Sequence, residues 1–192
     1  MIASSTFYSM DEQDILKIIE DDKWMMDILH VAQKLNLPDW MIGAGFVRNK
    51  VWDYLHGYKN EKVLTRDIDL IYFDKNNIDE NKDSQLSKET KENTGVDWEI
   101  VNQAYTHKWH NRESYRDAEE ALADWVETPT CVAVSINNEG KLQLYAPHGI
   151  DDLVNLTVRK NPRCSDAGSY ESRVTSKRWK EKWPKLNIII NL

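Results

Sequence analysis

The stretch Asp67-Ile68-Asp69 opens the apolar run from residue 67 to residue 73, and it constrains the fold more than any other feature of the chain. The run is rich in β-branched and aromatic residues, which predicts a β-strand. Side chains alternate between the two faces of a strand, so Asp67 and Asp69 share one face and Ile68 points to the other. Two carboxylates this close repel each other, and burying them without a cation is costly. The pattern predicts a metal-binding strand or, as the simpler alternative, a strand end with two solvated acids.

A glycine-rich turn precedes this strand by about two dozen residues. Residues 40–43 are typical of a short strand, and residues 46–55 of the helix that follows it. Gly43 and Gly45 would let the backbone turn tightly and approach a phosphate, which the positive end of the helix dipole also favours. Arg48, one turn into the helix, is placed to pair with triphosphate oxygens. Turn and carboxylates together indicate Mg²⁺ (or Mn²⁺) and a polyphosphate, although glycines alone also fit a purely steric turn.

These motifs resemble those of the DNA polymerase beta-type nucleotidyltransferase superfamily: Gly-x-Gly-x-x-Arg, then two aspartates on a strand, then the glutamate of Trp98-Glu99-Ile100. Residues 43–49 are similar to the Gly-Gly-x-Val-Arg-Asp signature in the head domain of bacterial CCA-adding enzymes, with Asn49 in place of the Asp. A resemblance to a family of small bacterial nucleotidyltransferase-like proteins extends over nearly the whole chain, through residues 98–104, 146–153 and 182–186. It implies an α+β, polymerase beta-like fold in which helices flank a small mixed sheet.

The resemblance also implies a set of site residues. The catalytic and metal-binding residues would be Asp67, Asp69 and Glu99, and the nucleotide-binding residues Gly43, Gly45 and Arg48. Glu99, on the neighbouring strand, would complete the ligands of Mg²⁺ or Mn²⁺ and help accept the proton of the attacking hydroxyl. From the residues alone Asp97 competes for this place, because it lies two positions away on the same strand face. The family motif favours Glu99.

Length and composition predict one globular domain over residues 1–192. The chain is 41% apolar and contains eight tryptophans, which is enough for a substantial core. No apolar run approaches the length needed to cross a bilayer, and the first nine residues have neither the basic start nor the apolar centre of a signal peptide. We therefore expect a cytoplasmic monomer without a membrane partner.

The net charge of −7 argues against a general nucleic-acid binder, but the charge is uneven. Residues 156–192 hold nine Lys and Arg against three Asp and Glu, a net charge of +6, so residues 1–155 carry −13. The basic segment either meets phosphates, of a nucleotide or an RNA acceptor, or forms a solvated helix face.

Periodicity and turn residues predict the remaining elements. Ser9 and Glu12 have the spacing of a capping box, which predicts the start of the first of two N-terminal helices. Residues 74–95 are polar and predict a solvent-facing helix or a mobile loop. Further helices are expected near residues 118–126, 150–156 and 170–179, a third strand at 96–101, and a hairpin of strands 131–136 and 142–146.

Three histidines are weaker candidates. His107 and His110 flank Trp109 but have no third soft ligand near in sequence, so surface histidines are expected rather than a metal pair. His148 lies in a Pro-His-Gly turn, where a substrate contact and a turn role are both open.

Two functional classes follow. The first is a metal-dependent enzyme that moves a nucleoside monophosphate from an NTP to a hydroxyl of RNA, a protein or a small molecule. The alternative is a catalytically silent nucleotide-binding or protein-interaction module. The three carboxylates favour the enzyme. A complete CCA-adding enzyme is not expected, because the base-selecting Glu-Asp-x-x-Arg motif and the chain for tRNA-binding neck and tail domains are missing.

Overall fold

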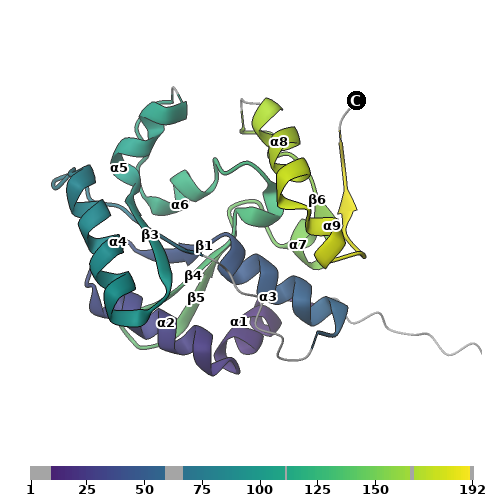
Figure 1. The fold of residues 1–192 in the computed structure, drawn as a ribbon, viewed down its shortest axis with the longest axis horizontal. Helices are drawn as coiled ribbons and strands as arrows, with labels where there is room; N and C mark the ends of the chain where they lie inside the picture. The colour runs from purple at the N-terminus through teal and green to yellow at the C-terminus, as the bar shows by residue number, and fades with distance from the viewer. Residues whose placement is uncertain (1–9, 59–66, 111, 165–166, 191–192) are drawn as a thin grey trace, which may run out of the picture.

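The computed structural model describes residues 10–58, 67–110, 112–164 and 167–190, in which a five-stranded mixed sheet is flanked by helices (Figure 1). The strand order is β3-β2-β1-β4-β5. The strands are β1 (Met41–Gly43), β2 (Asp67–Tyr72), β3 (Asp97–Asn102), β4 (Ala133–Ile136) and β5 (Leu142–Tyr145). β2 and β3 run parallel, and the other neighbouring strands are antiparallel. The predicted α+β class and mixed sheet are confirmed.

The helices are α1 (Glu12–Glu20), α2 (Lys23–Lys34), α3 (Gly45–His56), α4 (Glu80–Thr94), α5 (Gln103–Thr106), α6 (Ala118–Leu122), α7 (Asp151–Val154), α8 (Ala167–Lys177) and α9 (Trp179–Lys182), with 3₁₀ turns η1 (His107–His110) and η2 (Thr128–Thr130). α1 begins at a capping box in which Asp11 and Asp14 each accept the other's backbone N–H at 3.0 Å. The expected cap Ser9 lies outside the described residues. None of the described helices is long and apolar enough to cross a membrane.

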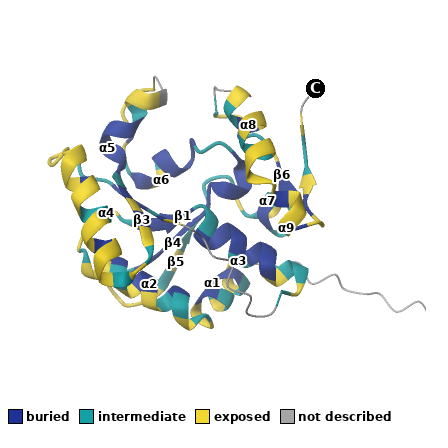
Figure 2. Ribbon diagram, in the orientation of Figure 1, coloured by how far each residue is buried: buried dark blue, intermediate teal, exposed yellow. Residues whose placement is uncertain are grey.

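α3 is buried on most of its surface, which Figure 2 shows as a nearly continuous dark blue helix. Trp52 is fully buried and packs edge-to-face against Trp179 and Trp183, with ring centroids 5.9 and 5.1 Å away. Trp183 also donates its indole N–H to the Asp53 carboxylate at 2.7 Å. The described residues of the range 156–190, which we refer to as the C-terminal segment, are therefore held against α3, the helix that follows the glycine turn.

The polar segment at 74–95 contains the helix α4 (Glu80–Thr94), whose outer face is exposed (Figure 2). Its anchor is the buried Asp83, which accepts the hydroxyls of Tyr72 at 2.5 Å and Tyr105 at 2.8 Å. Asp83 also accepts the backbone N–H of Asn102 at 2.8 Å. These bonds hold α4 against the β2–β3 pair and fix the strands that carry the acidic motif.

The helix expected at 118–126 ends at Leu122, which corrects the prediction. Asn161 donates its side-chain amide to the carbonyls of Ala123 and Trp125 at 2.7 Å each, so these carbonyls are satisfied outside a helix. The ring nitrogen Nε2 of His148 lies 2.8 Å from the same Ala123 carbonyl. The ring of His148 thus contacts the backbone that follows α6.

The C-terminal segment adds a parallel pair of strands, β6 (Thr157–Val158) and β7 (Asn187–Ile188), that the sequence did not predict. α8 is tied to this pair because the Tyr170 hydroxyl lies 3.0 Å from the Val158 carbonyl and 2.7 Å from the Ile189 carbonyl. α8 stands on one side above the sheet and the α5–α6 segment on the other (Figure 1).

Candidate functional site

Three carboxylates meet at one end of the parallel strand pair. Asp69 on β2 is in register with Glu99 on β3, and Asp67 precedes Asp69 on the same strand face. One carboxylate oxygen from each residue lies within 4.8 Å of the others. Ile68 between the two aspartates is fully buried on the opposite face. The alternation expected from strand geometry thus brings the three predicted acids together, and we refer to them as the acidic trio.

Asp97, the competing acid, does not join the trio. It lies in register with Asp67, but its carboxylate forms an ion pair with Lys91 on α4. A partner of opposite charge already balances it, so Glu99 is the β3 acid whose carboxylate meets the two aspartates.

The carboxylates of the trio lie close enough to change the pKa of Asp69. Desolvation of Asp69, followed by repulsion from Asp67 and Glu99, raises the pKa of the Asp69 carboxyl to about 7. The positive charges of Arg48 and Lys177 act in the opposite direction and do not cancel this effect. The pKa of Asp69 thus stays raised beside these two cations.

The acidic trio fits a divalent cation of the magnesium type. Carboxylate oxygens are the ligands preferred by Mg²⁺ and Mn²⁺, which bind to one or two carboxylates together with water and phosphate oxygens. Desolvation and then repulsion from Asp67 and Glu99 raise the pKa of Asp69, and such a cation would favour its charged form against both. His107 is not in this group.

His107 is more buried than expected for a surface histidine, and this corrects the prediction. Its ring packs edge-to-face against Tyr115 at 6.2 Å between centroids, and its Nδ1 is buried without a hydrogen-bond partner in the described part of the chain. The side chain of His110 lies outside what the structure describes.

The turn between β1 and α3 has its strained residue at Ala44 rather than at a glycine. Ala44 has φ 51° and ψ −122°, a conformation that favours glycine, whereas neither Gly43 nor Gly45 has a positive φ. Ala44 and Gly45 line the cleft described below, and the first turn of α3 carries no side-chain cap in the described chain. The α3 N-terminus therefore presents its amides toward this cleft.

Gly43 serves a packing role that the motif did not indicate. A Cβ atom at this position would lie 2.8 Å from the ring of Trp125, so the indole packs directly on the glycine backbone. Trp125 itself lines the cleft. The absence of a side chain at Gly43 thus shapes the cleft wall.

Arg48 lies on the cleft wall but is only 6% exposed. Its Nη1 donates to the Thr130 hydroxyl at 2.7 Å, and its Nε and Nη2 donate to the Asn49 side-chain oxygen at 3.2 and 3.0 Å. The guanidinium also lies 5.0 and 4.8 Å from the ring centroids of Trp52 and Trp179. Burial lowers the pKa of Arg48 to about 10, which leaves the group charged at neutral pH. Most N–H donors of Arg48 therefore bind to neighbouring side chains of the protein. A contact between Arg48 and a triphosphate stays a prediction.

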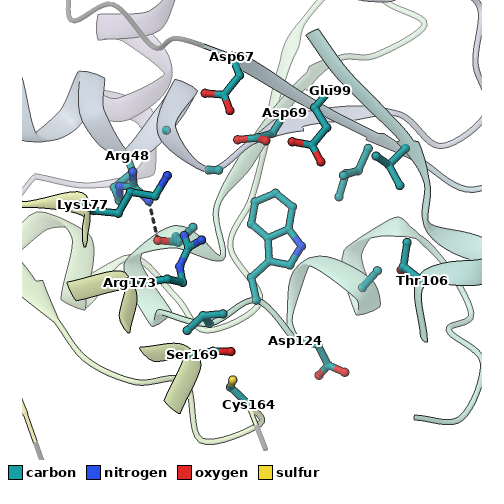
Figure 3. A pocket seen from close by; sticks show the side chains of 18 of the residues that line it. Arg48, Asp67, Asp69, Glu99, Thr106, Asp124, Cys164, Ser169, Arg173 and Lys177 are labelled. Atoms are coloured by element: carbon teal, nitrogen blue, oxygen red, sulfur yellow. Dashed lines mark hydrogen bonds between the residues drawn. The ribbon is translucent and has the colours of Figure 1, made fainter. Parts of the chain in front are cut away.

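A cleft of about 960 Å³ connects the trio, the α3 N-terminus and the C-terminal segment. Figure 3 shows the trio pointing into it from the top, with Arg48, Arg173 and Lys177 on its left side. Arg173 pairs at 2.6 Å with Glu127, whose side chain is fully buried, whereas Lys177 is exposed.

The sequence missed Arg173 and Lys177 as specific site residues. The only signal for them was the net positive charge of residues 156–192. Both side chains line the cleft, Arg173 half-buried and Lys177 exposed, and a contact of this segment with phosphates stays a prediction.

Comparison with known proteins agrees with this geometry. The model of a family described as nucleotidyltransferase matches residues 30–188. A solved NMR structure, described as revealing a CCA-adding enzyme head domain, is 31% identical with a TM-score of 0.82, over 94% of this chain and 97% of the other. No curated protein matches the chain.

Longer enzymes share the fold only. The Thermotoga maritima CCA-adding enzyme in complex with tRNA is 17% identical with a TM-score of 0.56, and a CCA-adding enzyme in complex with ATP is 15% identical with a TM-score of 0.57. These matches cover 95% and 92% of this chain but 43% of each enzyme, so the chain spans less than half of their length. The family resemblance stated from the motifs is confirmed.

Proposed function

Because the chain belongs to the nucleotidyltransferase family whose model matches residues 30–188, we propose that it transfers a nucleoside monophosphate from an NTP to a hydroxyl acceptor with the help of Mg²⁺ or Mn²⁺. The observation that carries this proposal is the convergence of three carboxylates in one cleft with a helix N-terminus and several cations. A triphosphate carries the negative charge that the cations would balance, and the trio would hold the metal.

The nucleotide-binding side of the proposed site is the turn of Gly43 and Gly45 with the wall of α3 and α8. The uncapped amides at the start of α3 would donate to phosphate oxygens, as helix N-termini commonly do. Arg48 would add positive charge from a rigid position, and Lys177 would reach the phosphates directly because it is exposed. The flexible Lys177 and the fixed Arg48 thus have different roles in this proposal.

The proposed reaction forms a bond between the acceptor hydroxyl oxygen and the α-phosphorus of the NTP. The bond from that phosphorus to the oxygen bridging to the β-phosphate breaks, and pyrophosphate leaves with the electron pair. Glu99, an exposed acid in register with Asp69, would take the hydroxyl proton. A cation bound by Asp67, Asp69 and Glu99 would supply charge neutralisation on the phosphate oxygens.

Transfer of label from NTPs tests the proposal. The protein is incubated with each α-labelled NTP, Mg²⁺ or Mn²⁺, and bulk cellular RNA or metabolite pools. We expect label to enter an acceptor from α-labelled but not from γ-labelled NTP, since pyrophosphate leaves. Asp69→Asn should lower this transfer by on the order of a hundredfold or more, because it removes one of the three carboxylates that would hold the metal beside the reacting phosphate.

Asp97→Asn is the matched control, since Asp97 lies on the same strand edge but pairs with Lys91 outside the trio. Equal loss in both variants, or transfer from γ-labelled NTP, would contradict the proposed chemistry. NTP binding without transfer to any pool would support the alternative of a silent module.

A further inference from the structure

A second cationic cluster lies in the same cleft, built around the buried carboxylate of Asp124. The Asp124 side chain is only 4% exposed and lies 2.6 Å from Arg163 Nε and 3.5 Å from Arg112 Nε. The Tyr115 hydroxyl donates to the same carboxylate at 3.1 Å. The contact with Arg163 is an ion pair rather than a well-directed hydrogen bond, since Asp124 Oδ1 has no hydrogen-bond partner within the described residues.

Among the contacts of the described residues, two guanidinium groups share one carboxylate, which gives this cluster one positive charge in excess. Both arginines approach Asp124 through Nε, which leaves their terminal nitrogens for other partners. Nη2 of Arg112 donates to the Arg163 backbone carbonyl, and its other terminal nitrogen is Nη1. The side chains of Arg112 and Arg163 are 35% and 43% exposed, so their remaining N–H groups are within reach of a ligand.

The arginine pair lines the cleft at a place distinct from the cations beside α3 and α8. In Figure 3, Asp124 lies near the bottom of the cleft, away from the trio at the top and from Arg48 and Lys177 at the left. Arg112, Arg163 and Asp124 all line this cleft together with the acidic trio. One continuous space thus connects two separate cationic regions with the carboxylates.

We propose that Arg112 and Arg163 form an anion subsite that holds a phosphate or carboxylate group of the acceptor. The inference rests on the proposed function and names the class of acceptor: a hydroxyl compound that also carries an anion. In an in-line transfer the acceptor and the departing pyrophosphate lie on opposite sides of the α-phosphorus. In this proposal the cations of α3 and α8 bind to the triphosphate. The separate pair of Arg112 and Arg163 is then left to bind an anionic group of the acceptor.

Two arginines held by one carboxylate suit this task. The guanidinium fork matches the geometry of phosphate and carboxylate oxygens, and the buried Asp124 fixes both side chains before the ligand arrives. A purely structural tie between the segments around residues 112 and 163 would need one arginine and would leave no net charge. Trp109, which is 61% exposed and packs edge-to-face on Tyr105, adds an aromatic rim to the same cleft.

Inorganic phosphate is the probe for this subsite. The nucleotide site is first filled with Mg²⁺ and a non-hydrolysable ATP analogue, and phosphate is then added at constant ionic strength while NMR follows the arginine Nε–H resonances. We expect saturable shifts of Arg112 and Arg163 in the millimolar range, with Arg48 unchanged. Acetate as a second probe distinguishes a preference for phosphate from one for any small anion. Chloride is then added in place of phosphate and acetate. Equal shifts of the Arg112 and Arg163 resonances with chloride would contradict the anion subsite.

Single variants separate binding from structural support. Arg163→Gln leaves Asp124 paired with Arg112 and Tyr115, so the fold should persist while phosphate affinity falls at least about tenfold, the scale of one charge-assisted hydrogen bond. Arg163→Lys should recover part of the affinity. The control is Arg116→Gln, since Arg116 is exposed and pairs with Glu120 outside the cleft.

The outcomes distinguish this inference from the proposed function. If the ATP analogue binds and the arginine resonances do not respond to phosphate, the anion subsite is wrong and the proposed function stands. If the analogue fails to bind to the native protein, the proposed function is wrong, and the response of Arg112 and Arg163 still reports on the pair.

Discussion

At the scale of single residues, the charge of Asp69 should favour metal binding but destabilise the metal-free folded state. Desolvation and the neighbouring Asp67 and Glu99 raise the pKa of its carboxyl to about 7 in the folded state, against an ordinary value near 3.8. Between these two pH values the folded state holds more protons than the unfolded state, so stability falls as pH rises through this window. Below the window both states are protonated, and the destabilisation is absent.

Asp69→Asn should therefore raise the stability of the metal-free protein above about pH 7, by on the order of 3 kcal/mol, because it removes the uncompensated charge. At about pH 4 the two proteins should unfold at similar temperatures. Thermal unfolding with EDTA at both pH values measures this difference. Added Mg²⁺ should stabilise the native protein and not the variant, since only the native trio binds it. If Asp69→Asn is less stable than the native protein at high pH, the residue has a structural role instead.

Ala44 gives a second prediction at this scale. Its positive φ strains an L-residue, so Ala44→Gly should raise the free energy of unfolding by about 1 kcal/mol. Urea denaturation should show a higher midpoint with an unchanged slope. Ala146→Gly is the control, because Ala146 has no positive φ and should lose stability on the same change. A lower midpoint for Ala44→Gly would contradict the strain.

The residues of the trio could be predicted from sequence because strand geometry is local. Period two places Asp67 and Asp69 on one face, and the short apolar-Glu-apolar motif supplies Glu99. Arg173 and Lys177 could not be predicted individually, since their positions depend on how α8 packs against η2 through the buried Glu127. Sequence spacing contains no record of a contact between segments this far apart.

At the scale of elements, length explains several of the outcomes. The longer helices and the six-residue strands β2 and β3 have enough residues to show a period. The paired strands β6 and β7 contain two residues each and show none. The helix expected at 118–126 ends early because Asp124 and Trp125 donate their N–H groups to carbonyls three residues back rather than four. Asn161, distant in sequence, binds the carbonyls that follow this helix.

α8 carries the prediction that belongs to this scale. Lys177→Gln should weaken binding of ATP with Mg²⁺ by about tenfold, or 1.4 kcal/mol, because one exposed cation on this helix no longer meets the phosphates. Binding of AMP should change little, since AMP lacks the β- and γ-phosphates. Calorimetric titration with both nucleotides measures the difference.

Arg178→Gln is the matched control for α8, because Arg178 follows Lys177 directly but pairs with Glu181 and does not line the cleft. An equal loss of ATP affinity in both variants would indicate general charge screening. An equal loss for AMP and ATP in Lys177→Gln would place the lysine away from the β- and γ-phosphates.

At the scale of the whole molecule, a polymerase beta-like sheet presents its acids to a cleft that the C-terminal segment closes on one side. α8 and α9 supply the wall that faces the trio, and Trp52 on α3 holds this wall in place by packing against Trp179 and Trp183. The chain spans 43% of the length of the CCA-adding enzyme that shares its fold. We therefore do not assign the tRNA acceptor of that enzyme to this protein. We propose that residues 1–192 act as one domain around this cleft.

Paramagnetic broadening by Mn²⁺ tests the central claim, that the three carboxylates form a metal site. With substoichiometric Mn²⁺, backbone NMR signals around Asp67, Asp69 and Glu99 should broaden first, and Mg²⁺ in excess should restore them. In Asp69→Asn the effect should require far more Mn²⁺, whereas Asp97→Asn should behave like the native protein. Broadening centred on His107, or equal broadening in Asp69→Asn and the native protein, would contradict the metal site.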